Sequence, residues 1–334
     1  MIQDFVIADS LHLLELGVMK RLLTGWRDGY FGFTGKLSAF QTQCLSSAIC
    51  DVKLPKEIHR KLRGLDCLAF WKGTEWRSFL LYAGIVVLKD VLDEKLYKHF
   101  LLFFTAVTIC SSDMYAHMRA VAQALFEKFI EEFKTIYGEQ YITSNIHNLE
   151  HVVNDVNRFG SLNTISAYPF ESYLFQIKKL LRQGNNCLEQ VINRMLEKQS
   201  VKKNNTNPFS KFVPNLVTRN GIVECEVQAG VFISNTSRNS WFLTRNLEIV
   251  QMVDGSIDSN NDINIIGRPV KTYSNFFEIP IKSSHLYIFM AGLSMNNKKS
   301  YGVNDVLCKF VAVPYRGKHF VFVPLLHTIN VSPK

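Results

Sequence analysis

The 334-residue sequence lacks several patterns that would assign a function directly. It has no CxxC pair among its seven cysteines, no glycine-rich phosphate loop and no G-x-S-x-G nucleophile elbow. The odd number of cysteines, in a chain too long to depend on disulfides, predicts reduced and mostly buried thiols. No basic segment leads into an apolar run at the N-terminus, so we expect an intracellular protein, nuclear or cytoplasmic, that is not secreted. The most apolar stretches, 79–88 and 100–110, are shorter than the roughly 20 residues that span a bilayer, so no membrane association is expected.

The excess of positive charge is moderate and unevenly distributed. The formal net charge is +9, from 38 Lys and Arg against 29 Asp and Glu. Residues 201–334 hold 15 of the basic and 8 of the acidic residues, which leaves 23 against 21 for residues 1–200. The C-terminal third is therefore the natural place for contacts with phosphate groups, although a solvated basic surface explains the same surplus.

Two kinds of hydrophobic pattern divide the chain, and they predict an α+β fold. Apolar residues at helical spacing predict a mainly helical region over residues 1–200. The polar segment 201–210 predicts a linker, and beyond it short β-branched and aromatic runs alternate with turn residues. Residues 211–334 are therefore expected to form a small all-β domain, barrel-like or sandwich. The expected helices are 11–22, 37–50, 75–91, 92–110, 114–137, 145–159, one opening near Pro169, and 187–198; the expected strands include 221–227, 241–244, 263–266, 285–290, 306–313 and 320–326.

Two short motifs admit both a chemical and a structural interpretation. Asp9 and His12 form D-x-x-H, which places a carboxylate and an imidazole one turn apart, but an Asp before an apolar helical run is also a typical N-cap. His147, Glu150 and His151 form H-x-x-E-H, the spacing of inverted zinc metallopeptidases. Their apolar neighbours suit a helix packed in a bundle equally well.

A third motif opens a helix at Tyr168-Pro169-Phe170-Glu171. A carboxylate in the first turn is favoured by the helix dipole, and a packed helix also fixes the direction of a metal-binding Glu171. Lys178 and Arg182 follow at seven and eleven residues, on roughly the same helical face, with Lys179 beside them. An acidic group above basic residues fits a site that handles phosphodiesters, or a surface ion network.

The ordered combination of three segments is more specific than any motif alone. Together they resemble the C-terminal half of the catalytic region in CACTA-type cut-and-paste transposases. The segments are DSLHLLELGVMKRLLTGW (9–26), FWKGTEWRSFLLY (70–82) and the stretch from YGEQYITSNIHNLEH to FQIKKLLR (137–182). The similarity spans about residues 5–200. The resemblance implies the remnant of an RNase H-like DDE core with a helical insertion.

That resemblance also implies roles for individual residues. In the family, two Asp and one Glu hold two Mg²⁺ or Mn²⁺ ions for attack on a phosphodiester. Asp9 and His12 match the D-x-x-H that follows the second catalytic Asp, and Glu171 matches the third carboxylate. Lys178, Lys179 and Arg182 are the candidate DNA contacts.

Both catalytic Asp of the family precede D-x-x-H, whereas Met1 stands eight residues before Asp9. We therefore expect a truncated or domesticated copy with no intact metal site and no strand transfer. Its expected capacities are contact with DNA and association with another transposase-like chain or a second copy of itself. The alternatives are an active transposase whose gene model lost its upstream exons, a host interaction module without a nucleic-acid role, and a metallopeptidase.

Overall fold

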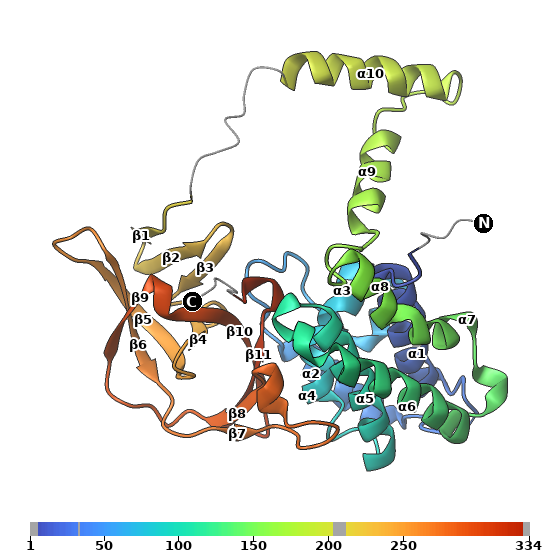
Figure 1. Ribbon diagram of the computed structural model, residues 1–334, viewed down its shortest axis with the longest axis horizontal. Coiled ribbons are helices and arrows are strands. Elements are labelled where there is room, and N and C mark those ends of the chain that lie inside the picture. The colour runs from blue at the N-terminus through green and yellow to red at the C-terminus, as the bar shows by residue number, and fades with distance from the viewer. Residues whose placement is uncertain (1–5, 33, 203–211, 330–334) are drawn as a thin grey trace.

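The computed structural model describes residues 6–32, 34–202 and 212–329, and a helical region is followed there by an antiparallel β region (Figure 1). The fold class expected from the sequence is thereby confirmed. The helical elements, with π- and 3-10-helical turns written η, are η1 (Ser10–Met19), α1 (Lys20–Asp28), α2 (Ala39–Asp51), η2 (Leu65–Phe70), α3 (Gly73–Ser78), η3 (Phe79–Ala83), α4 (Gly84–Val87), α5 (Glu94–Cys110), η4 (Asp113–Met118), α6 (Arg119–Tyr137), η5 (Glu139–Tyr141), α7 (Ser144–His147), η6 (Asn148–His151), α8 (Val152–Phe159), α9 (Tyr168–Lys178) and α10 (Cys187–Lys202).

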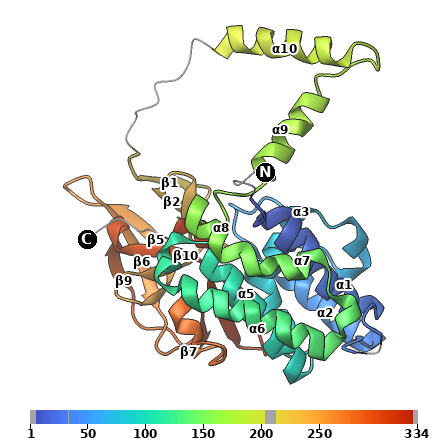
Figure 2. The same ribbon diagram turned by 45° about the vertical axis from the view of Figure 1, so that its right-hand side comes forward.

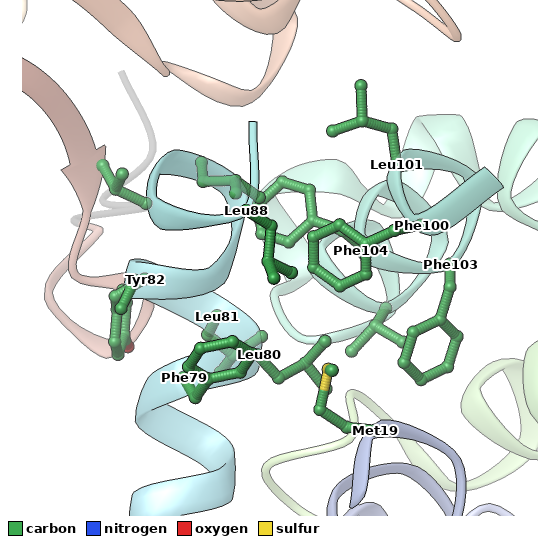
Figure 3. Packing of buried hydrophobic residues seen from close by; sticks show 14 of the residues in the cluster. Met19, Phe79, Leu80, Leu81, Tyr82, Leu88, Phe100, Leu101, Phe103 and Phe104 are labelled. Carbon is green, nitrogen blue, oxygen red and sulfur yellow. The ribbon is translucent and has the colours of Figure 1, made fainter. Parts of the chain in front are cut away.

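Helix α5 forms the centre of the helical region. Asp93 caps its start by accepting a hydrogen bond from the backbone N–H of Leu96, and every residue from 99 to 110 is buried. Figure 3 shows how Phe100, Phe103 and Phe104 of α5 pack with Met19 and the apolar residues of η3. A helix that is buried on all sides takes its stability from this packing rather than from intrinsic helix propensity.

The β region contains two antiparallel sheets, one of three strands in the order β1-β2-β3 and one of eight in the order β7-β8-β11-β10-β4-β5-β6-β9. The hairpin predicted at residues 316–318 joins β10 and β11, and Arg316 and Gly317 take the positive φ angles of 43° and 77° that this turn requires. The elements are β1 (Asn215–Arg219), β2 (Ile222–Gln228), β3 (Val231–Ser234), β4 (Trp241–Thr244), β5 (Ile249–Ile257), β6 (Ile263–Pro269), β7 (Ser274–Asn275), η7 (Ser283–Leu286), β8 (Phe289–Gly292), β9 (Lys299–Gly302), η8 (Val303–Asp305), β10 (Val306–Tyr315), β11 (His319–Pro324) and η9 (Leu326–Thr328).

The two regions share one hydrophobic core rather than packing as separate bodies. The main cluster of buried apolar side chains runs from Ala8 of the helical region to Ile329 of the β region. Tyr115 donates a hydrogen bond across the boundary to the carbonyl oxygen of Leu286 at 3.0 Å.

A buried ion pair also joins the regions. Lys309 of β10 is fully buried, and its Nζ lies 3.0 and 2.9 Å from the two carboxylate oxygens of Glu57. The same ammonium group donates to the carbonyl oxygen of Phe232 and to Oδ1 of Asn239.

Helices α9 and α10 project from the body of the protein, as both views show (Figures 1 and 2). No residue of α9 is buried, although its sequence has an apolar stripe. We refer to residues 168–202 as the arm. The large apolar side chains that the arm exposes are Phe170, Tyr173, Leu174, Phe175, Leu188, Ile192 and Leu196.

Three expectations need correction. Residues 285–290 were expected to form a strand, but Ser283 Oγ accepts from Phe276 N–H and donates to the Ile288 carbonyl, which folds 283–286 into the turn η7 before β8 begins. Three cysteines are buried, one is half-buried and three are exposed, so the thiols are not mostly buried. The expected linker overlaps the end of α10, and its residues 203–210 lie outside the described residues.

In the part of the chain that the structure describes, no helix combines the length and the apolar character needed to cross a membrane.

Candidate functional site

Asp9 connects the beginnings of two helices that are far apart in the sequence. It adopts an extended conformation before η1, and Oδ1 accepts hydrogen bonds from the backbone N–H groups of Leu11 (3.2 Å) and Ala167 (2.8 Å). Its other oxygen, Oδ2, accepts from the backbone N–H of His12 at 3.0 Å. The N-cap interpretation of Asp9 is confirmed, and the same carboxylate also holds the residue before α9.

The structure brings His12 and Glu171 to this point as well. The Nδ1 atom of His12 lies 2.5 Å from Asp9 Oδ2, and its Nε2 lies 3.7 Å from Oε1 of Glu171. Glu171 is in the first turn of α9, where the helix dipole favours a negative charge. The side chains of His12 and Glu171 are 55% and 54% exposed, so the imidazole and the carboxylate both face solvent. Asp9 orients the ring, and Glu171 faces this imidazole from the first turn of α9 while remaining open to solvent.

Beneath these residues lies a buried carboxyl group that the sequence interpretation missed. Glu15 of η1 is 3% exposed and accepts a hydrogen bond from the hydroxyl of Tyr168, the first residue of α9. Burial raises the pKa of Glu15 to about 8, and the guanidinium group of Arg77 opposes that shift. Burial and the neighbouring Glu15 also raise the pKa of Tyr168. Glu15 and Tyr168 therefore form a second link between η1 and α9.

Asp155 of α8, which is also buried, links α8 to the segment before η1. Its Oδ2 accepts hydrogen bonds from the backbone N–H groups of Ile7 (2.7 Å) and Ala8 (2.9 Å), directly before Asp9. One signal for Glu15 was present in the sequence, because it lies four residues after Leu11 and three before Val18, on the apolar face of the expected helix. The position of Asp155 carried no comparable signal.

The three segments 9–26, 70–82 and 137–182 thus converge at one place. The first supplies Asp9, His12 and Glu15, the second supplies Arg77, and the third supplies Glu171 together with Tyr168 and Asp155. The guanidinium carbon of Arg77 lies 5.8 Å from the centre of the Tyr168 ring. We refer to Asp9, His12, Glu15, Arg77, Tyr168 and Glu171 as the η1–α9 site.

The donor set of the η1–α9 site does not fit a pair of metal ions. Both oxygens of Asp9 are occupied by N–H donors, and Glu15 is buried against Tyr168. Glu171 is the one exposed carboxylate of the site, and two-metal sites need several. Over residues 6–32, 34–202 and 212–329, no group of three or more His, Cys, Asp or Glu side chains is placed to hold a metal ion.

The H-x-x-E-H motif lies on a packed helical segment. His147 and His151 are on one face with ring centres 5.9 Å apart, and Nδ1 of His147 is 3.7 Å from Oε1 of Glu150. The apolar residues between and after the two histidines face the core, which confirms the expected helix packing. They are Leu149, Val152, Val153 and Val156. Among the described residues no third ligand joins the two histidines in a metal-holding group.

Three basic residues of the arm, Lys178, Lys179 and Arg182, are exposed but do not form one helical stripe. Helix α9 ends at Lys178, so Arg182 does not continue the face of Glu171, and that expectation is wrong. The backbone N–H of Arg182 instead donates to Oε1 of Gln190 at 3.0 Å, in the connection to α10. The ammonium group of Lys179 lies 4.5 Å from the centre of the Phe175 ring.

Comparison with known proteins gives one match. A family model described as a domain of unknown function (DUF8592) matches residues 216–325, which form about a third of the chain and nearly all of the β region. No curated protein and no solved structure matches the chain. The match concerns the β region, whereas the resemblance to CACTA-type transposases concerns the helical region.

Proposed function

We propose that the helical region is derived from the C-terminal part of a DDE transposase catalytic region and that this chain binds DNA or a partner without cutting DNA. The convergence of the three motif segments on the η1–α9 site is the observation that carries the proposal. The three segments lie far apart along the sequence, and their order alone does not require that they meet in the folded chain. Their meeting around Glu171 supports a common origin as one site.

The proposed lack of DNA cleavage follows from the small number of carboxylates at the η1–α9 site that could bind a metal ion. Phosphodiester cleavage by Mg²⁺ or Mn²⁺ in this family depends on a metal pair held by three carboxylates. Glu171 is suited to be one of them, but the oxygens of Asp9 are engaged by N–H donors. In this proposal Asp9 and His12 position the start of α9 and are not themselves metal ligands.

Contact with DNA is proposed for three basic residues of the arm that lie at and just after the end of α9. Lys178, Lys179 and Arg182 are exposed, and they follow Glu171 along the chain. Cationic side chains on a projecting element can reach a phosphate backbone without displacing any part of the protein core.

A DNA experiment tests both parts of the proposal. Labelled duplex DNA is incubated with the purified chain and Mg²⁺ or Mn²⁺, and we expect a salt-dependent shift in a gel but no nicking. Nicking that disappears in Glu171→Gln would overturn the proposed lack of cleavage and would favour an active transposase. For binding, the triple variant Lys178→Ala/Lys179→Ala/Arg182→Ala should reduce the slope of log affinity against log salt by roughly 2–3.

The matched control removes three exposed lysines from the opposite part of the helical region: Lys95→Ala/Lys128→Ala/Lys134→Ala. An equal loss of salt dependence in the control and the arm variant would show that the arm has no specific role.

A second candidate function, an interaction module without a nucleic-acid role, is favoured by the exposed apolar side chains of the arm. Several large apolar side chains exposed on one projecting element are typical of protein contact sites. If the arm joins two copies of the chain, light scattering should give a dimer mass that falls to the monomer mass in Phe170→Ser/Phe175→Ser. A monomer at all concentrations, together with DNA binding, would exclude this candidate.

A further inference from the structure

A cavity of about 790 Å³ lies where the helical region meets the end of the β region. One wall is the loop of residues 57–61 between α2 and η2, and the opposite wall is α3 with Tyr82 of η3. His327 of η9 closes the side that faces the β region. The volume is within the range of about 300–1,000 Å³ that is typical of sites for small molecules.

Two ion pairs hold the walls of this cavity in place. Arg63 forms a two-pronged interaction with Glu75, with Nε and Nη2 each 2.7 Å from a carboxylate oxygen, and this fixes the loop against α3. At the other end of the loop, Glu57 is bound by Lys309 of the β region. The cavity is therefore a preformed feature of the junction, since both ends of its loop wall are anchored.

The charge that lines the cavity is positive and largely uncompensated. Arg60 and Lys61 are exposed and make no ion pair within 4 Å in the described parts of the chain. The acidic residue of the lining, Glu57, is already neutralised by Lys309.

Arg77, the third cation, donates one N–H to Oδ1 of Asn163 and has no ion pair with a described carboxylate. The nearby acid, Glu15, has a pKa that burial raises to about 8, which favours its neutral carboxyl form.

We propose that this cavity binds a phosphate-bearing ligand, whose phosphate oxygens contact Arg60, Lys61 and Arg77. Arginine guanidinium groups match the geometry of phosphate oxygens, and the imidazoles of His59 and His327 add N–H donors on two sides. The phosphates belong either to a small polyphosphate compound or to a nucleic-acid strand. The proposal does not depend on the transposase-derived origin of the helical region.

Titration calorimetry on the full chain tests the proposal with two probes, inorganic pyrophosphate and a short single-stranded oligonucleotide. We expect at least one probe to bind, and Arg60→Gln/Lys61→Gln to weaken that binding at least about tenfold. Both side chains are exposed, and Arg60 acts on the buried Glu75 through its charge alone. The double variant is therefore expected to unfold at nearly the same denaturant concentration as the parent chain. The matched control, Lys128→Gln/Lys134→Gln on α6, should bind as the parent chain does.

The outcomes separate the sources of the phosphate. Binding of pyrophosphate alone identifies a small polyphosphate ligand, and binding of the oligonucleotide alone, or its competition with pyrophosphate, identifies strand phosphates. No binding of either probe, or binding that is equal in Arg60→Gln/Lys61→Gln and the parent chain, overturns the proposal. DNA binding that depends on Lys178 and Lys179 but not on Arg60 and Lys61 would exclude a nucleic-acid strand as the ligand of the cavity, while leaving the proposed role of the arm intact.

Discussion

Replacing Asp9 with alanine should loosen two helix starts at once. The carboxylate accepts three backbone N–H groups and holds the ring of His12, and its side chain is only 20% exposed. Loss of an N-cap costs about 1 kcal/mol, within a range of roughly 0.5–2. The bonds to Ala167 and His12 involve a charged acceptor and add about 1–2 kcal/mol after allowance for solvent screening. The free energy of unfolding of Asp9→Ala should therefore fall by about 1.5–4 kcal/mol.

Asp93→Ala is the matched control, because Asp93 caps α5 through one backbone N–H and contacts no second helix start. Its expected cost is about 1 kcal/mol. Urea unfolding measures the total effect, and hydrogen exchange measures the local one: the amide of Ala167 should exchange faster in Asp9→Ala and unchanged in Asp93→Ala. If both variants lose the same stability and the Ala167 amide is unaffected, then Asp9 does not hold η1 and α9 together, and the argument for the η1–α9 site fails.

Further predictions concern buried charge. Because burial raises the pKa of Glu15 from an ordinary 4.5 to about 8, the stability that its protonated form provides is complete below pH 4.5 and is lost as the pH rises through 8. The free energy of unfolding of Glu15→Gln, measured in urea, should therefore rise relative to that of the parent chain between pH 5 and pH 8.5. A constant difference between the two free energies over this pH range would contradict the prediction. Lys309→Met leaves Glu57 buried without its cation and should cost about 3–5 kcal/mol, while Lys309→Met/Glu57→Leu should recover part of that loss. A double variant as unstable as the sum of its single changes would refute the coupling between these two residues.

The fold class could be predicted because the two regions use different hydrophobic periods. Helical spacing places α5 and α6 within a few residues of their observed ends, and alternating or continuous β-branched runs place β4 and β10. The end of α9 could not be predicted from its apolar stripe, because no residue of α9 is buried and core packing therefore does not determine where the helix ends. The shared core between the regions was also inaccessible, since it depends on contacts such as that of Tyr115 with Leu286, 171 residues apart.

Only the parts of the η1–α9 site that depend on near neighbours in the sequence could be predicted. Local signals identify Asp9 as a cap and place Glu171 in a first helical turn, because both depend on neighbours within four residues. The bond from Ala167 to Asp9 and the burial of Glu15 against Tyr168 depend on how α9 docks on η1. Spacing along a helix cannot supply that docking. It places Glu15 on the apolar face, but it does not identify the hydroxyl that satisfies the buried carboxyl group.

Helix α3 is the physical connection between the η1–α9 site and the cavity that Arg60, Lys61 and Arg77 line. A Cβ atom at Gly73 would lie 2.4 Å from Cδ1 of Leu11 and 2.9 Å from the hydroxyl oxygen of Tyr168, so the absence of a side chain lets α3 approach both η1 and α9 closely. Arg77 follows one turn later on the same face of α3. From there it reaches Asn163 and the cavity on one side and the ring of Tyr168 on the other. A phosphate held by Arg77 would therefore share this guanidinium group with the ring of Tyr168 at the start of α9, so that α3 connects the two sites through one side chain.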